Sequence, residues 1–278
     1  MCGSRSRPGR RFLLKTRHIA NLAGPYLARI GYRGPTRPSV EGLRSIHKKH
    51  LLSIPFENLD IHLGRPIILS QEAFFEKIIT HRRGGFCYEL NGSFAALLTS
   101  LGFKVRMLSA RVAQKNSGFT PEFDHMTLLI TMKDRWLADV GFGDSFTEPK
   151  RLDYEGPQTD NGRVYRITRR AGGRLLSRWD GEKNRWEPQY IFSLRPRSLG
   201  DFVRRCRFQQ TSPNSHFKKG QVCTLLKRDG RITLTDSKLI VTRGGSRIER
   251  PVNSRGEFSR LLRKWFGINL HNDSRRKG

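Results

Sequence analysis

The sequence predicts an α+β fold in which helices come first, an antiparallel sheet or small barrel follows, and a hairpin and a helix close the chain. Three observations predict it. Apolar residues recur at helical spacing from Tyr26 to Gly102, short β-like runs separated by turns fill residues 105–179, and a hairpin signal at Asp229-Gly230 precedes a last amphipathic run. A chain of 278 residues with 36% hydrophobic content can form one compact unit or two to three small domains.

Three helices are expected in the first third of the chain. Ser39 and Ser70 have the residue type that caps helix N-termini, and each precedes apolar positions at helical spacing. Those positions are Leu43, Ile46, Leu51 and Leu52 for the first helix, and Phe74, Phe75, Ile78 and Ile79 for the second. The third run, Cys87 to Ser100, begins after Gly84-Gly85 and stops before Gly102, a typical glycine end signal.

The middle and last parts of the chain read mainly as strands. The expected strands of the sheet or barrel are Val105–Val112, His125–Met132, Trp136–Phe142, Val164–Thr168 and Leu175–Trp179. Val222–Leu226 and Ile232–Leu234 then flank Asp229-Gly230 and predict a hairpin. The closing helix is indicated by Phe258, Leu261, Leu262, Trp265 and Phe266.

The net charge of +29 could attract nucleic acid, anionic membranes or anionic small molecules. The basic residues are spread along the chain and no known nucleic-acid motif is present, so we expect a basic surface and no dedicated nucleic-acid site. Residues 1–23 are basic, and the first acidic residue is Glu41. That segment can be a mitochondrial transit peptide, but we favour a disordered extension or a remnant of cloning.

Other classes of protein are excluded by what the sequence lacks. No run of 18 apolar residues predicts a membrane span, and no secretory signal is evident at Leu13-Leu14. The four cysteines show no CxxC spacing, so neither a metal site nor a disulfide framework is expected. We therefore expect a cytoplasmic protein; its oligomeric state is not indicated.

Cys87 is the candidate nucleophile. It follows Arg82-Arg83-Gly84-Gly85-Phe86 and starts a predicted helix, where free N–H groups and the positive dipole end stabilise a thiolate. The neighbouring Arg82 and Arg83 are expected to act in the same direction. Cys206 and Cys223 lack a glycine-rich approach and are interpreted as ordinary core cysteines.

A nucleophilic thiol usually needs a base, and that base needs an orienting partner. His125 heads an apolar strand, and Asp139 lies in an otherwise apolar run where an unpaired carboxylate would be costly. Asp124 and Asp144 are rival partners in more polar surroundings. A hairpin centred on Met132 would place His125 opposite Asp139, whereas a turn at residues 133–134 would put them on opposite faces, so the residues alone leave the pairing open.

Five segments resemble signature motifs of the arylamine N-acetyltransferases. They are RRGGFCYELNG at Arg82–Gly92, IPFENLD at Ile54–Asp60, LADVGFG at Leu137–Gly143, WEPQY at Trp186–Tyr190 and RCRFQQTSPNSHF at Arg205–Phe217. The likeness runs in order from about Tyr26 to Leu270. Residues 1–23 and the high Arg and Lys content depart from the usual pattern.

The resemblance implies an α+β fold with an N-terminal helical bundle (24–104), a central antiparallel β-barrel (105–204) and a C-terminal α/β lid (205–278), in a papain-like arrangement. It maps the nucleophile onto Cys87, the base onto His125 and the orienting carboxylate onto Asp139. It also implies an amine pocket that includes Phe56 and Phe142, with Gly143 near the CoA end. No metal is implied.

The implied activity is a ping-pong transfer of the acetyl group from acetyl-CoA, through acetyl-Cys87, to a small aromatic amine or hydrazine. His125 would deprotonate Cys87, or the two would already form a thiolate–imidazolium pair. A cysteine hydrolase with the same triad and an amide synthase that closes a macrolactam are the alternatives. Persistence of the acyl-enzyme would argue against the first, and CoA dependence would argue against the second.

Overall fold

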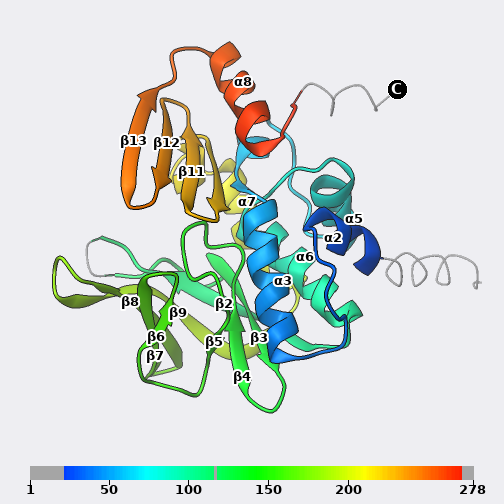
Figure 1. Ribbon diagram of the computed structural model, residues 1–278, viewed down its shortest axis with the longest axis vertical. Coiled ribbons are helices and arrows are strands. Elements are labelled where there is room, and N and C mark those ends of the chain that lie inside the picture. The colour runs from blue at the N-terminus through cyan, green and yellow to red at the C-terminus, as the bar shows by residue number, and fades with distance from the viewer. Residues whose placement is uncertain (1–21, 116–117, 271–278) are drawn as a thin grey trace, which may run out of the picture.

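The structure is a computed structural model that describes residues 22–115 and 118–270. The predicted basic extension, residues 1–23, lies outside the described residues except for its last two, and Ala23 already begins a helix. Helices and sheets are segregated as an α+β fold requires (Figure 1). The larger sheet, mostly green, lies in the lower part of Figure 1, and the smaller sheet, mostly orange, lies with α8 in the upper part.

The first third of the chain is helical, as predicted. Its elements are α2 (Ala23–Arg29), α3 (Val40–Ser53), α4 (Leu59–His62), α5 (Gln71–Phe75), the π-helix η1 (Glu76–Thr80) and α6 (Cys87–Ser100). Both predicted caps are confirmed: the hydroxyl oxygens of Ser39 and Ser70 accept the N–H of Gly42 at 3.0 Å and of Ala73 at 3.2 Å. Gly102 follows α6 with a φ of +87°, which favours glycine at the helix end.

Helix α6 lies at the centre of the molecule. Its side chains are buried from Cys87 to Ala95, because the helix packs against other helices on one side and against the eight-stranded sheet on the other. The helix is buried on nearly every side, so its first residue has a fixed place in the core.

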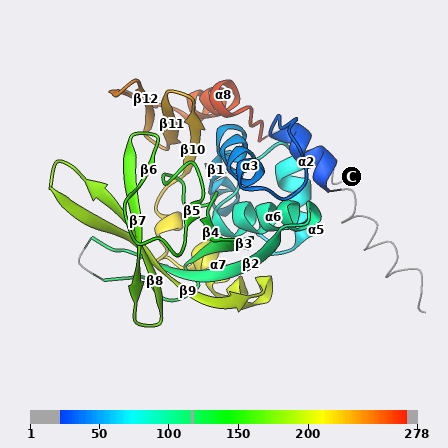
Figure 2. The ribbon, with the colours of Figure 1, turned by 60° about the horizontal axis from the view of Figure 1, so that its bottom comes forward.

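The middle of the chain forms one antiparallel eight-stranded sheet in the order β5-β4-β3-β2-β9-β8-β7-β6. Its strands are β2 (Lys104–Val112), β3 (His125–Thr131), β4 (Arg135–Ala138), β5 (Lys150–Arg151), β6 (Gln158–Asp160), β7 (Arg163–Arg170), β8 (Gly173–Asp180) and β9 (Arg185–Arg197). The sheet curls around an apolar core that includes Phe146, Tyr165 and Phe192 (Figure 2). The Gln158 side chain joins the two edge strands by bonding both the N–H and the C=O of Arg151, so the barrel is nearly closed.

The predicted strand Trp136–Phe142 is too long. Strand β4 ends at Ala138, and the next three backbone N–H groups bond side chains in place of a neighbouring strand. The N–H of Asp139 donates to His47, that of Val140 donates to Asn91, and that of Gly141 donates to the Asp139 carboxylate. The chain leaves the sheet here because its hydrogen bonds are satisfied elsewhere.

A five-stranded antiparallel sheet, in the order β1-β10-β11-β12-β13, closes the molecule. Its strands are β1 (Phe56–Glu57), β10 (Val222–Lys227), β11 (Gly230–Thr235), β12 (Lys238–Arg243) and β13 (Ser246–Pro251). The predicted Asp229-Gly230 hairpin is confirmed, with Lys227 paired to Gly230. Helix α8 (Arg255–Phe266) covers this sheet. Helix α7 (Leu199–Thr211) and the short helix η2 (His216–Lys218) come before β10 in the chain. Because β1 pairs with β10, the helical part and the C-terminal part share a sheet.

Candidate active site

Cys87 is the first residue of α6 and is 3% exposed. The preceding glycines allow close packing: a Cβ at Gly84 would collide with the carbonyl oxygen of Pro55, and one at Gly85 would lie 2.7 Å from the Glu89 carboxylate. Neither glycine has a positive φ. Glycine is therefore required at both positions by the close approach of neighbouring atoms and not by the backbone conformation. The Glu89 carboxylate accepts the N–H of Phe86 at 3.1 Å and caps the helix.

The Cys87 sulfur faces the start of β3. Its Sγ lies 4.0 Å from the carbonyl oxygen of Asp124, next to His125 in the chain. Burial raises the pKa of the Cys87 thiol well above its ordinary value, and a hydrogen bond from the Met126 backbone acts in the opposite direction. Because burial disfavours the thiolate, its formation depends on a base or a cation beside it.

His125 and Asp139 form a buried pair. The His125 Nε2 lies 2.6 Å from Asp139 Oδ2, and both side chains are almost fully buried. Burial pushes the pKa of the Asp139 carboxyl upward, but the attraction of His125 and the hydrogen bonds from Asn91 and Gly141 outweigh it, so the pKa lies below its ordinary value. Asp139 is therefore held as a carboxylate, and the second imidazole nitrogen of His125 is left for another partner.

The β3–β4 register explains why the pair meets, and both expected registers were wrong. Thr131 pairs with Arg135 and Leu128 with Ala138, so the hairpin is centred on Lys133. One further step in this register would place Asp139 opposite Thr127. Since residues two apart share a face, His125 and Asp139 lie diagonally on the same face.

The rival carboxylates have other partners. Asp124 Oδ1 lies 2.5 Å from Arg205 Nε and also accepts the Gln209 amide. Asp144 pairs with Arg163 at 2.7 Å and with Arg231 at 3.2 Å. Neither carboxylate is placed to orient His125.

Arg82 and Arg83 were expected to stabilise the Cys87 thiolate, but neither guanidinium is placed to do so. Arg82 is exposed, and the Arg83 guanidinium lies 2.8 Å from Glu57 and 2.9 Å from Asp60. Lys77 joins the same buried group through Asp60 at 2.7 Å and Glu89 at 2.8 Å. Burial raises the pKa of the Glu89 carboxyl to about 7; the Glu57 and Asp60 carboxylates act in the same direction, and Lys77 acts against them. Arg83 thus holds the approach to α6 and does not face the thiol.

Two positioning residues were missed by the sequence analysis. Asn91 lies one helical turn after Cys87; its amide donates to the carbonyl of Met126 at 2.7 Å and to Asp139 Oδ1 at 2.9 Å, and its oxygen accepts the N–H of Val140. Its spacing from Cys87 could have indicated it. His47 on α3 accepts the N–H of Asp139 at 3.1 Å and bonds the carbonyl of Thr147 at 2.9 Å, and nothing in the local sequence signals this.

The candidate pocket residues border the pair. The Phe142 ring lies 5.2 Å from the His125 ring in an edge-on geometry. Gly143 has a φ of +89°, and a Cβ there would lie 3.7 Å from the Phe56 ring. Phe56 in turn lies 6.2 Å from Phe217 of η2. The structure therefore brings Phe56, Phe142 and Gly143 to one edge of the site.

Within residues 22–115 and 118–270, no group of three or more His, Cys, Asp or Glu side chains could hold a metal ion. In the same part of the chain, no helix is both long and apolar enough to cross a membrane. A buried cysteine at a helix start beside a His–carboxylate pair is an arrangement suited to acyl transfer or hydrolysis.

Comparison with known proteins separates these classes. The family model described as N-acetyltransferase matches residues 39–275. A curated arylamine N-acetyltransferase of Mycolicibacterium smegmatis is 36% identical over 89% of this chain and 92% of its own length. The Escherichia coli enzyme of the same name is 33% identical over 88% of each chain.

Solved structures agree. The arylamine N-acetyltransferase of Salmonella typhimurium has a TM-score of 0.84 and 33% identity, covering 89% of this chain and 91% of its own. The Mycobacterium marinum enzyme in complex with CoA has a TM-score of 0.83 and 33% identity, covering 90% and 94%. The fold and these likenesses define an N-acetyltransferase. More narrowly, the chain belongs to the arylamine N-acetyltransferase family.

Proposed function

We propose that this enzyme transfers the acetyl group of acetyl-CoA to an aromatic amine or hydrazine through an acetyl-Cys87 intermediate, in a ping-pong sequence. The observation that carries the proposal is the buried 2.6 Å contact between His125 and Asp139 at the start of the strand that faces the Cys87 sulfur. Family membership supports the acyl donor and the acceptor class.

In the first half-reaction, His125 acts through Nδ1, because Nε2 is bound to Asp139. The imidazole takes the thiol proton as the sulfur attacks the thioester carbonyl carbon, and Asp139 stabilises the imidazolium. Free N–H groups at the start of α6 stabilise the tetrahedral oxyanion. Collapse breaks the bond to the CoA sulfur, which leaves with the proton from His125, and Cys87 remains acetylated.

In the second half-reaction, the neutral amine attacks the acetyl-Cys87 carbonyl. His125 accepts the proton that the amine nitrogen loses. The tetrahedral species then expels the Cys87 sulfur, and His125 returns the proton to that sulfur. The amine ring would lie against Phe56 and Phe142, and the pantetheine end of CoA would pass Gly143. Apolar walls favour transfer over hydrolysis because they keep water from the thioester.

We also propose that the protein is cytoplasmic. The thiols of Cys87, Cys206 and Cys223 are free, and a thiol nucleophile stays active only where it stays reduced.

The test is intact-protein mass spectrometry after mixing with acetyl-CoA and no amine. We expect one acetyl adduct that an added arylamine discharges, and no adduct in Cys87→Ala. Cys206→Ala is the matched control, because Cys206 is also buried and its thiol has a pKa raised to about 12 by burial; it should still be acetylated. Absence of an adduct with intact thioester would overturn the proposal. Rapid thioester loss without an adduct would indicate a hydrolase.

A further inference from the structure

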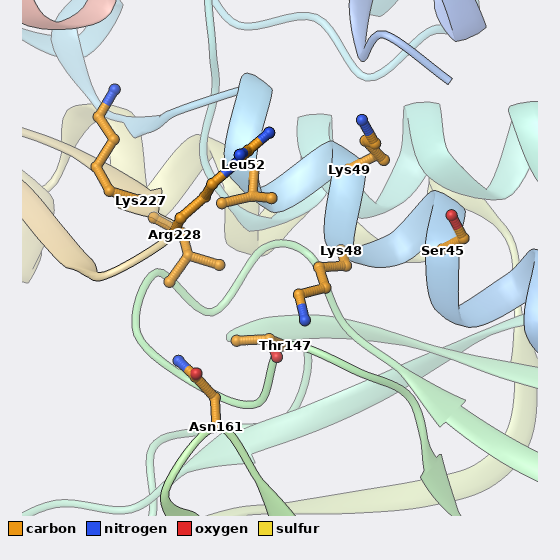
Figure 3. A pocket seen from close by; sticks show the side chains of 9 residues that line it. Ser45, Lys48, Lys49, Leu52, Thr147, Asn161, Lys227 and Arg228 are labelled. Carbon is orange, nitrogen blue, oxygen red and sulfur yellow. The ribbon is translucent and has the colours of Figure 1, made fainter. Parts of the chain in front are cut away.

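Each member of the candidate His–Asp pair lies on a stretch of backbone that a neighbouring helix holds in place. The loop after Asp139 is held from α3, because His47 accepts the N–H of Asp139 and bonds the carbonyl of Thr147. Figure 3 shows Thr147 facing the Lys48 side chain of α3 across a cavity of about 350 Å³. The segment just before β3, the strand that begins with the candidate base, is held from α7.

Asp124 is the residue through which α7 holds that segment. Its carboxylate Oδ1 lies 2.5 Å from Arg205 Nε and also accepts the Gln209 amide. Gln209 is buried, and the side chains of Asp124 and Arg205 are only 9% and 19% exposed. A charge-assisted hydrogen bond between groups that are largely out of water is strong and directional. The Asp124 side chain is therefore fixed relative to α7.

The backbone of the same segment has an unfavourable conformation at Phe123. Its φ is +68°, in the left-handed region that disfavours residues with a Cβ. Its carbonyl accepts the Tyr88 hydroxyl of α6 at 2.8 Å. Its ring lies 5.4 Å from the Phe202 ring of α7 and 4.9 Å from the Arg197 guanidinium of β9. Such a conformation persists only where its surroundings hold it, and here two helices and a strand do so.

The segment meets the nucleophile through its backbone. The carbonyl oxygen of Asp124 lies 4.0 Å from the Cys87 sulfur, and the Met126 backbone gives the same sulfur a hydrogen bond. His125 lies between these two residues in the chain, so both neighbours of the candidate base contact the thiol. The Asp124 carboxylate itself turns to α7. Its bonds there fix the backbone that carries both the imidazole and an N–H group able to stabilise a thiolate.

We infer that Asp124 is a positioning residue: through its bonds to α7 it fixes the backbone from which His125 and the following N–H meet the Cys87 thiol. This inference rests on the proposed function, because it takes Cys87 as the nucleophile and His125 as the base.

Position and charge at Asp124 have opposite effects on the thiol. Burial is the main cause of the raised pKa of Cys87, and the negative charge of Asp124 adds to it. Losing that charge alone would therefore lower the thiol pKa. Losing the position of the segment would raise it, because the hydrogen bond from the Met126 backbone favours the thiolate.

The test compares Asp124→Ala and Asp124→Asn with a control, Asp153→Ala. Alanine removes the charge and the bonds to α7, whereas asparagine removes the charge and keeps an oxygen acceptor for those bonds. Asp153 also binds an arginine, Arg135, but at the first residue of β4, away from Asp139, which follows the last. The readout is the pH midpoint of Cys87 alkylation by iodoacetamide, with peptide mass spectrometry to separate Cys87 from the other thiols.

We expect the midpoint of Asp124→Ala to lie about one pH unit above that of the wild type. Its kcat for acetyl transfer should fall roughly tenfold, with the KM for acetyl-CoA nearly unchanged. Asp124→Asn should show a smaller change in both, and Asp153→Ala should match the wild type. An unchanged or lowered midpoint in Asp124→Ala, or an equal shift in the control, would overturn the inference.

A second variant keeps the test decisive if Asp124→Ala does not fold. Gln209→Met removes one bond to Asp124 and no charge. A raised midpoint in this variant supports the inference, and an unchanged one overturns it. Alkylation needs neither substrate, so a raised midpoint in an enzyme that transfers no acetyl group would support the role of Asp124 and count against the proposed function instead.

Discussion

The imidazole of His47 joins both ends of the 139–147 loop, because one nitrogen accepts the N–H of Asp139 and the other bonds the carbonyl of Thr147. Only a neutral ring can do both. Burial lowers the pKa of His47 to about 4, while Asp139 and Asp160 act to raise it and Lys150 to lower it. Acid should therefore break this link by protonating the ring.

The sign of the effect follows from proton binding. Between the ordinary histidine pKa and about 4, the unfolded chain binds a proton at His47 that the folded chain does not. Stability from this residue is thus complete above pH 6.5 and falls by about 3 kcal/mol as the pH drops to 4. His47→Gln, which keeps a donor and an acceptor, should remove that part of the pH dependence.

Urea unfolding of both proteins across that pH range measures the difference. His50 is buried and has a lowered pKa as well, so the wild type and the variant share its contribution. Parallel stability curves for the two proteins would show that His47 does not titrate as described.

At the scale of elements, the segment from Arg82 to Phe86 places the start of α6. Arg83 lies between Glu57 and Asp60 in the buried charge group, whereas its neighbour Arg82 is exposed. Removing one partner from a buried ionic group leaves the other charges uncompensated. We expect Arg83→Met to lower the free energy of unfolding by about 3–5 kcal/mol and Arg82→Met by less than about 1 kcal/mol.

Chemical denaturation of the two variants provides the comparison. Because Arg82 is exposed and takes no part in the buried charge group, the alkylation rate of Cys87 under native conditions should change little in Arg82→Met. A similar loss of stability in both variants would contradict the role given to Arg83.

Elements with strong local signals were predictable, and the others were not. The serine caps, the glycine before Cys87 and the hairpin at residues 229–230 depend on short-range chemistry that one segment contains. Strand β9 was missed because Pro188 and a bulge interrupt it, and β13 was missed because all six of its residues are exposed and show no alternation. Helix α7 buries only Phe202, Cys206 and Gln209, although Ser198 and Asp201 form a capping box that could have revealed it.

In the candidate site, too, only features that one segment determines could be predicted, and features that depend on the packing of the whole molecule could not. Cys87 and its place at a helix start could be predicted from the sequence, and a histidine base could be expected. The partner of His125 could not be predicted, because a one-residue slip in the pairing of the two strands decides whether Asp139 lies on the same face as His125. The roles of His47 and Asn91 arise only when α3, α6 and the 139–147 loop are packed together.

The excess of positive charge is a property of the whole surface. The chain has 53 Lys and Arg against 24 Asp and Glu, and many of the acidic side chains are already paired, as at Asp144 and Glu249. An anionic donor therefore approaches a positive field, while a neutral arylamine does not feel it. Salt should weaken the first interaction and leave the second almost unchanged.

We expect the KM for acetyl-CoA to rise roughly tenfold between about 0.05 and 0.5 M NaCl, because screening lengths shrink over this range. The arylamine KM should change less than twofold. The 3′-dephospho form of acetyl-CoA carries less charge, so its KM should depend less steeply on salt. Steady-state kinetics with each substrate in turn measures all three. Equal salt dependence of donor and amine would mean that the surface charge plays no part in capturing the donor.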